Sequence, residues 1–579
     1  MKNNIVYKVL KGLKKYFFIL VLLGFLVSYI TIQIAVLMQY AIDGIIFQNY
    51  NCLPTILKDL LFRDVFKDLV MFGIIIFSTT LVCCLLKYLR DILSEKFSLI
   101  INRNLKTELF KHIFNLEYNS YYSCEKAEIV QRINEDADSF SSFFKNQFNL
   151  IIEVISLIIF IINQSISMNY YLTYYIIATM IILLLFTLWY YKRLNKQMED
   201  NIYKKKLLLK YTLDNVKRFK TIKILNRQKE ESKQYKVLND SYTDSNIKLI
   251  NLIVFYEIIS DHITYLKNPI SYLIGGISII KGLMTIGELT AFLNFTSKLF
   301  NCFLSLGVNL ESISNFSIIT KKLNRLYNLK EEDSDKKEYD LNGDIIYSNV
   351  GLTIENEKIL NNMNFIIKKG EKVAIIGENG SGKSILIKSM LGFCNYTGSI
   401  YINNHNIRRI NKSNIRQYIE LLEGESFLFS GKLLDNIILN QENDNFKLNN
   451  ILEECEIIDE VDNLEEKIDT IIGENGIKLS GGQKQRVALA RSLYQNKKII
   501  IFDEGLNKLD NKTREKVLNN LYKNNKDKTI LFATHNTEIL KYVDKVIFIS
   551  NHTTYVGPHK ELYNKNREYK KYIKYSMSE

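Results

Sequence analysis

The stretch Gly377-Glu378-Asn379-Gly380-Ser381-Gly382-Lys383-Ser384 decides the fold of the second half of this chain. It fits the phosphate-binding pattern GxxxxGK[ST], and the apolar residues just before it predict a buried strand. Its three glycines allow the backbone to wrap closely around phosphate oxygens without a clashing side chain. We therefore expect all eight residues to bind a nucleotide such as ATP. Lys383 would reach its β- and γ-phosphates, and the Ser384 hydroxyl would be a ligand of Mg²⁺.

A second apolar strand, residues 498–502, ends in two adjacent carboxylates, Asp503 and Glu504. Asp503 suits Mg²⁺ binding, and Glu504 suits polarising the water that attacks the γ-phosphate. Acidic residues are common at strand ends for structural reasons alone. The phosphate loop upstream favours the catalytic interpretation.

The composition indicates more than one domain and an uneven distribution of apolar residues. The chain has 579 residues, 47% of them hydrophobic, and a mean hydropathy near zero. Long apolar runs fill roughly the first 310 residues, and the remainder alternates like a soluble α/β protein. The net charge of +14 comes largely from Lys and Arg beside the apolar runs. Membrane topology explains that charge better than a nucleic-acid partner does. The seven cysteines show no metal-ligand spacing.

Six apolar segments are long enough to cross a bilayer of about 30 Å. They are residues 16–42, 66–90, 144–163, 170–190, 256–281 and 288–311. The long basic segments 87–145 and 190–248 are predicted to be cytoplasmic, which also places the nucleotide-binding half inside the cell. Helical periodicity without Pro or Gly predicts that the helices continue well beyond the membrane. Short breaks near residues 118–126 and 209–218 would turn the chain at the cytoplasmic tips, where it could contact a soluble domain.

An acidic residue, Glu153, lies in the middle of the third predicted span. Burying a charge in lipid is costly, so such a residue either lines a polar cavity or pairs with another helix. An acidic cavity wall would favour a cationic substrate. The sequence leaves both interpretations open.

The string Leu479-Ser480-Gly481-Gly482-Gln483 is the most specific motif in the chain. With it, the chain resembles the ATP-binding cassette (ABC) transporters, in particular exporters with a six-span membrane domain fused ahead of the nucleotide-binding domain. By this resemblance, residues 480–483 (Ser480, Gly481, Gly482 and Gln483) cap the γ-phosphate held by the opposite subunit. His535 matches the histidine that contacts the γ-phosphate. The physics agrees, because a helix N-terminus with two glycines exposes backbone N–H groups to an anion.

Two residues depart from the family pattern. Gly424 stands where the family usually has a glutamine that links Mg²⁺ and the attacking water to the membrane domain. Ile354 stands where an aromatic ring usually stacks on adenine, and isoleucine can cover that ring without offering a π-face. We expect weaker nucleotide discrimination and slower coupled turnover.

The predicted fold is an α-helical six-span transmembrane domain with long cytoplasmic helix extensions, followed by an α/β P-loop ABC domain. The boundaries are residues 1–328, a linker at 329–340, and 341–579. Only about 15 residues precede the first span, so we expect no N-terminal protease domain.

The predicted function is ATP-driven export of a peptide, lipid or amphipathic drug from the cytoplasm. It requires ATP, Mg²⁺, the membrane bilayer and a second half-transporter, with a homodimer favoured over a heterodimer and no nucleic acid. The expected location is the plasma membrane, in a bacterium. Two alternatives are an ATP-gated regulatory or sensor membrane protein and the less active half of a heterodimeric exporter.

Overall fold

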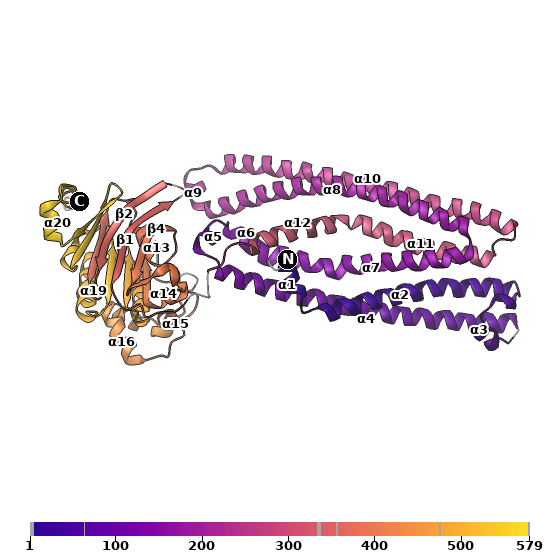
Figure 1. The fold of residues 1–579 in the computed structure, drawn as a ribbon, viewed down its shortest axis with the longest axis horizontal. Helices are drawn as coiled ribbons and strands as arrows, with labels where there is room; N and C mark the ends of the chain where they lie inside the picture. The colour runs from indigo at the N-terminus through magenta and orange to yellow at the C-terminus, as the bar shows by residue number, and fades with distance from the viewer. Residues whose placement is uncertain (1–4, 63, 333–336, 355–356, 474–475, 577–579) are drawn as a thin grey trace. The chain divides into compact units, whose positions relative to one another are not determined.

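The computed structural model of the chain describes residues 5–62, 64–332, 337–354, 357–473 and 476–576. It divides into two compact units. The first comprises residues 1–114 and 124–329, and the second comprises residues 115–123 and 330–579. Figure 1 shows the first unit as a set of long helices and the second as an α/β fold. Part of the predicted linker, residues 333–336, lies outside the described residues.

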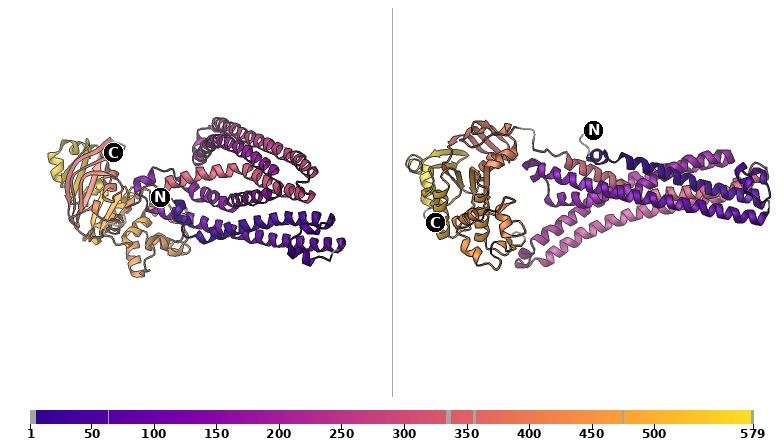
Figure 2. Two further views of the ribbon diagram at one scale, coloured as in Figure 1. Left: turned by 45° about the vertical axis from the view of Figure 1, so that its right-hand side comes forward. Right: turned by 90° about the horizontal axis from the view of Figure 1, so that it is seen from below.

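Long helices make up the first unit because its apolar runs contain almost no helix-breaking residues. The α-helices of this unit, short ones included, are α1 (Ile5–Leu10), α2 (Lys14–Tyr40), α3 (Thr55–Leu60), α4 (Val65–Asn115), α6 (Lys126–Gln131), α7 (Ala137–Met168), α8 (Tyr170–Lys217), α9 (Phe219–Ile224), α10 (Gln228–Ile280), α11 (Ile286–Val308) and α12 (Leu310–Tyr327). α8 and α10 run side by side along most of their length, as two views show (Figures 1 and 2). α11 packs against α2, α7 and α10.

Within the described residues, five helices are long and apolar enough to cross a membrane, and a sixth span is present if a bent pair counts as one. The five begin at Lys14, Val65, Glu128, Tyr170 and Gln228, and the bent pair is Ile286–Gly307 with Leu310–Tyr327. α8 has 48 residues and α10 has 53, far more than the ~20 that a bilayer requires. The multi-span architecture and the long helix extensions therefore match the predicted fold class.

The second unit contains two sheets. A four-stranded antiparallel sheet has the order β2-β1-β4-β5, and a six-stranded sheet has the order β10-β9-β3-β8-β7-β6. The strands are β1 (Ile345–Ile354), β2 (Glu357–Ile367), β3 (Lys372–Gly377), β4 (Tyr396–Ile402), β5 (His405–Asn406), β6 (Ile419–Glu423), β7 (Ile499–Asp503), β8 (Thr529–Ala533), β9 (Lys545–Ser550) and β10 (Thr553–Gly557). In the six-stranded sheet, the neighbours β9, β3, β8, β7 and β6 all run parallel, so their carboxyl ends lie at the same edge of the sheet.

Helices flank the six-stranded sheet and bury its apolar strands. They are α13 (Lys383–Met390), α14 (Lys412–Tyr418), α15 (Leu433–Ile438), α16 (Asn445–Glu454), α17 (Ile458–Asp462), α18 (Gly481–Tyr494), α19 (Asn511–Asn524), α20 (His559–Lys565) and α21 (Arg567–Ser576). Every residue of β3 and β8 is buried. The second unit also contains α5 (Tyr118–Tyr122), a short helix that lies between α4 and α6 in sequence.

Candidate nucleotide-binding site

The phosphate loop connects the end of β3 to the start of α13 and needs its glycines. Gly380 and Gly382 have φ angles of +81° and +107°, a backbone region that other residues rarely adopt. A Cβ on Gly377 would lie 2.5 Å from the carbonyl oxygen of Ile549, too close for any other residue. The loop therefore takes the shape that lets backbone N–H groups face a phosphate.

Lys383 is positioned by the loop itself. Its ammonium donates to the carbonyl oxygens of Gly377 and Glu378 at 2.8 and 2.9 Å. Burial lowers the pKa of Lys383, and the nearby carboxylates Glu504 and Asp503 oppose that shift. The side chain thus lies against the loop where a nucleotide's phosphates would be held.

Ser384 and Asp503 come together at the carboxyl edge of the sheet. The Ser384 hydroxyl donates to a carboxylate oxygen of Asp503 at 3.2 Å. Burial raises the pKa of Asp503, and its hydrogen bond from Ser384 acts in the opposite direction. A hydroxyl and a carboxylate are the oxygen donors that Mg²⁺ prefers, and this ion usually takes only a few protein ligands beside substrate phosphates. The two predicted metal ligands therefore fit Mg²⁺.

Glu504 follows β7 in a left-handed conformation, with a φ angle of +57°. Its backbone N–H donates to the carbonyl of Ala533 at 2.9 Å, which holds this unusual turn. The carboxylate lies 3.7 Å from Nδ1 of His535. Non-glycine residues with positive φ are uncommon and often occur at functional sites. The structure thus brings Glu504 and His535 together at the end of β7.

A cavity of about 870 Å³ opens beside the phosphate loop. Its lining includes loop residues 377–381, His535, Ile359 and Tyr572. Among the described residues that line it, none belongs to the signature string 479–483. β1 ends at Ile354, whose backbone pairs with that of Glu357 in β2. The side chain of Ile354 lies outside the described part of the structure.

The signature string forms the start of α18. Ser480 is the N-cap: its hydroxyl accepts from the Gln483 N–H at 3.3 Å, and the Gln483 side chain accepts from the Ser480 N–H at 2.8 Å. This reciprocal capping box fixes the helix start and leaves Gly481 and Gly482 in its first turn. A 14-residue helix with this start can offer its N-terminus to an anion.

Two models of the ABC transporter family match this chain. The transmembrane-region model matches residues 17–303, and the ABC transporter model matches residues 360–507. The chain belongs to the ABC transporters. It has the exporter arrangement, in which the membrane domain precedes the ATP-binding domain, and it couples ATP hydrolysis to export.

Curated relatives of this ABC transporter are exporters. A lacticin-481/lactococcin-DR transport/processing ATP-binding protein of Lactococcus lactis is 28% identical over 88% of this chain and 73% of its own length. A multidrug export ATP-binding/permease protein of Staphylococcus aureus is 26% identical over 96% of this chain and 97% of its own. The structure of a bacterial Atm1-family ABC exporter with ATP bound has the same fold. Its TM-score is 0.83 at 20% identity, covering 96% of this chain and 98% of the other.

Tyr572 is a site residue that the sequence did not single out. It belongs to α21, near the end of the chain, and its hydroxyl donates to the Gly377 carbonyl at 3.4 Å. Burial raises the pKa of Tyr572, as does the nearby carboxylate of Glu378. The two residues are 195 positions apart. No local pattern in α21 signals a contact with the phosphate loop.

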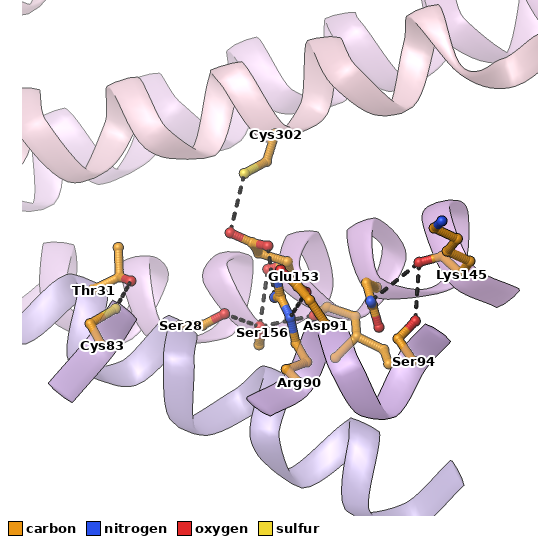
Figure 3. Close-up of polar contacts among 12 residues, drawn as sticks. Ser28, Thr31, Cys83, Arg90, Asp91, Ser94, Lys145, Glu153, Ser156 and Cys302 are labelled. Atoms are coloured by element: carbon orange, nitrogen blue, oxygen red, sulfur yellow. Dashed lines mark hydrogen bonds and ion pairs between the residues drawn. The ribbon is translucent and has the colours of Figure 1, made fainter. Parts of the chain in front are cut away.

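In the transporter's membrane domain, Glu153 pairs with another helix. A guanidinium N–H of Arg90 on α4 donates to its carboxylate at 3.1 Å, and the thiol of Cys302 on α11 lies 3.9 Å from it (Figure 3). Arg90 also binds Asp91 at 3.1 Å. The negative charge of Glu153 is therefore compensated. The structure therefore agrees with the interpretation that Glu153 pairs with another helix. It gives no support to an acidic cavity wall that would favour a cationic substrate.

Proposed function

We propose that this exporter works as a dimer of identical chains, with ATP held between the phosphate loop of one copy and the signature helix of the other. The observation that supports this proposal is the division of the site. The nucleotide cavity is lined by phosphate-loop residues 377–381 and by His535, which lies beside Glu504. Lys383, bound to the loop, and the Ser384–Asp503 contact follow directly on that loop. The described lining of that cavity includes no signature residue. Because one chain carries both halves, two identical copies can complete two sites.

The residues of the site divide the work of hydrolysis. Ser384 and Asp503 would hold Mg²⁺, which supplies charge neutralisation at the β- and γ-phosphates. Glu504 orients the attacking water and takes its proton, and Lys383 binds the phosphate oxygens. His535, beside Glu504, contacts the γ-phosphate. ATP binding closes the two nucleotide domains and hydrolysis reopens them, which drives alternating access in the membrane domain.

We propose that the substrate is a peptide, a lipid or an amphipathic drug, exported across the plasma membrane of a bacterium. The names of the Lactococcus and Staphylococcus relatives support the peptide and drug classes respectively. Their bacterial origin supports the location.

Replacing the proposed base tests the assignment. In full-length protein reconstituted in lipid nanodiscs, Glu504→Gln should lower the ATPase rate by about 10²- to 10⁴-fold, because the amide cannot accept the proton. Binding of a fluorescent ATP analogue should persist. The matched control is Glu515→Gln, an exposed glutamate on α19, which should leave the rate unchanged. A Glu504→Gln protein that still hydrolyses ATP near the wild-type rate would contradict the assignment.

A regulatory or sensor protein that binds ATP without pumping is the second candidate, and Gly424 favours it. The glutamine that usually connects the γ-phosphate to the membrane domain is absent there. Measuring ATPase stimulation by candidate peptides, lipids and drugs in reconstituted vesicles separates the two functions. Stimulation by any of them supports export, and intact ATP binding without stimulation supports the sensor.

A further inference from the structure

The exposed face of α11 is polar. From Gly287 to Gly307, the residues whose side chains are exposed are Asn294, Lys298, Asn301 and Ser305. Their spacing of four, three and four residues places them on one face of the helix. Many apolar residues of α11, among them Phe292, Phe295, Leu299 and Phe300, are buried instead.

This pattern is the reverse of a lipid-facing helix. On α8, the exposed residues between positions 181 and 188 include Ile181, Ile182, Leu184, Leu185 and Leu188, all apolar. Lipid chains can solvate that face of α8, but they cannot satisfy the amides and the ammonium on α11. The polar stripe of α11 is therefore unsuited to face lipid.

Lys298 lies near the middle of α11, far from either helix end. It is 12 residues from the start of α11 and 10 from its end. At about 1.5 Å per residue, either end is roughly 15 Å or more away, beyond the reach of a four-carbon side chain. Within the described residues, no carboxylate forms an ion pair with Lys298.

Lys267 shows how a structural lysine is accommodated in the same bundle. It is 3% exposed. Its ammonium donates to the Ser297 hydroxyl at 2.7 Å and lies 5.4 Å from the centre of the Phe300 ring. Lys298, the next residue after Ser297, is exposed and has no comparable partner in the described structure. The two lysines therefore have different roles.

Positive charge exceeds negative charge around Lys298. Lys87 and Glu153 both lie within electrostatic reach of its ammonium. Glu153 is already bound by Arg90, which also binds Asp91, and Figure 3 shows this cluster below Cys302. Among the described residues, neither Lys87 nor Lys298 forms an ion pair with a carboxylate. The excess would attract an anion.

We propose that the stripe Asn294–Lys298–Asn301–Ser305 binds an anionic group of the exported substrate, a carboxylate, sulfate or phosphate. This inference rests on the export function proposed above and gives its substrate a charge. The Lys298 ammonium supplies the attraction, and the amide of Asn301, three residues further along the same face, donates a hydrogen bond to the same group. Arg90 and Glu153 hold the neighbouring helices and do not contact the substrate.

Charged thiol reagents test whether the stripe is accessible to water and whether its electrostatic potential is positive. The test does not require ATP hydrolysis. In a cysteine-free variant that still binds ATP, Asn301→Cys is reacted in zwitterionic nanodiscs with methanethiosulfonates bearing either a sulfonate or a trimethylammonium group. Rates are divided by those of a free thiol. We expect the anionic reagent to react several-fold faster than the cationic one. Adding Lys298→Ala should abolish this preference, Lys298→Glu should invert it, and Lys298→Arg should retain it.

Two controls and a protection assay complete the test. Leu185→Cys, on the apolar face of α8, should react with neither reagent, and Asn294→Cys should repeat the preference if the first variant folds poorly. Dodecyl phosphate or a short acidic peptide should protect the cysteine at position 301 from labelling. Protection by the first indicates that a lipid-like molecule carries the anionic group, and protection by the second indicates a peptide. Dodecyltrimethylammonium should not protect this cysteine. An unreactive stripe, a faster cationic reagent or equal protection by the cation would overturn the proposal. Because labelling is independent of ATPase activity, its failure is distinct from failure of the proposed export function.

Discussion

At the scale of single residues, Gly424 has a physical consequence for Glu504. A Cβ at position 424 would lie 3.3 Å from both the Cβ and the carbonyl oxygen of Glu504. The backbones of Glu423 and Glu504 also pair as an isolated antiparallel β-bridge. The backbone of Glu504, the proposed base, therefore packs directly against Gly424. Any side chain introduced there displaces Glu504 by a few tenths of an ångström.

Two substitutions at this position separate steric from chemical effects. Gly424→Ala should lower the ATPase rate a few-fold, because its methyl group presses on Glu504. Gly424→Gln brings the same Cβ together with an amide that can reach Mg²⁺ and water, so it should be faster than the alanine variant. ATPase assays over a range of Mg²⁺ concentrations measure both effects. Equal rates for the two variants would show that the amide contributes nothing here.

Asp503, the proposed Mg²⁺ ligand, destabilises the folded protein when no metal is bound. Its pKa is raised by burial, so at pH 7 the folded state holds a charge that the unfolded state solvates better. Without nucleotide and Mg²⁺, Asp503→Asn should raise the Tm at pH 7 by roughly 2–4 °C, the shift that about 1 kcal/mol produces in a domain of this size.

The sign of this effect sets its pH dependence. As the pH falls through the raised pKa of Asp503, the carboxylate becomes neutral in the folded protein and the advantage of Asn should vanish. Thermal unfolding of the full-length protein between pH 7 and lower pH, in the presence of a chelator, checks both points. A lower Tm for Asp503→Asn at pH 7 would rule out a buried-charge penalty.

At the scale of elements, the start of α18 combines helix capping with anion binding, and two variants of Ser480 distinguish them. Aspartate is as good an N-cap as serine, so Ser480→Asp should preserve slow amide hydrogen exchange in the first turn of α18. Its negative charge should repel the γ-phosphate and abolish hydrolysis. Ser480→Ala should lose about 1 kcal/mol of helix stability and exchange faster, with partial activity. Wild-type hydrolysis by Ser480→Asp would exclude a phosphate at this helix.

The short helix α5 shows where sequence reasoning succeeds and where it stops. A break near residues 118–126 is predictable, and α5 begins at Tyr118. Its place in the second unit is not predictable from a local pattern. It depends on the Tyr118 ring, which stacks on Phe393 with centroids 4.4 Å apart, and on an ion pair between Glu117 and Lys330 at 2.7 Å. Burial raises the pKa of Tyr118, and Tyr122 and Glu423 add to the shift.

The same distinction holds for the candidate site. The phosphate loop and the strand that delivers Asp503 are continuous stretches, so their spacing alone predicts them. Contacts between distant segments leave no such pattern. The Arg90–Glu153 pair spans 63 residues and the Tyr572–Gly377 contact spans 195. The polar stripe of α11 also required the structure, because only burial shows that Asn294 and Lys298 face away from the protein core.

At the scale of the whole molecule, the central claim is that two copies of the chain share each ATP. Cross-linking tests it directly. In a cysteine-free Glu504→Gln background, chains carrying Asn379→Cys on the phosphate loop are mixed with chains carrying Lys478→Cys beside the signature helix. A short bifunctional thiol reagent should join the two kinds of chain when ATP is bound, and neither kind should cross-link with itself. Absence of an ATP-dependent mixed dimer, although each chain binds ATP, would contradict the account.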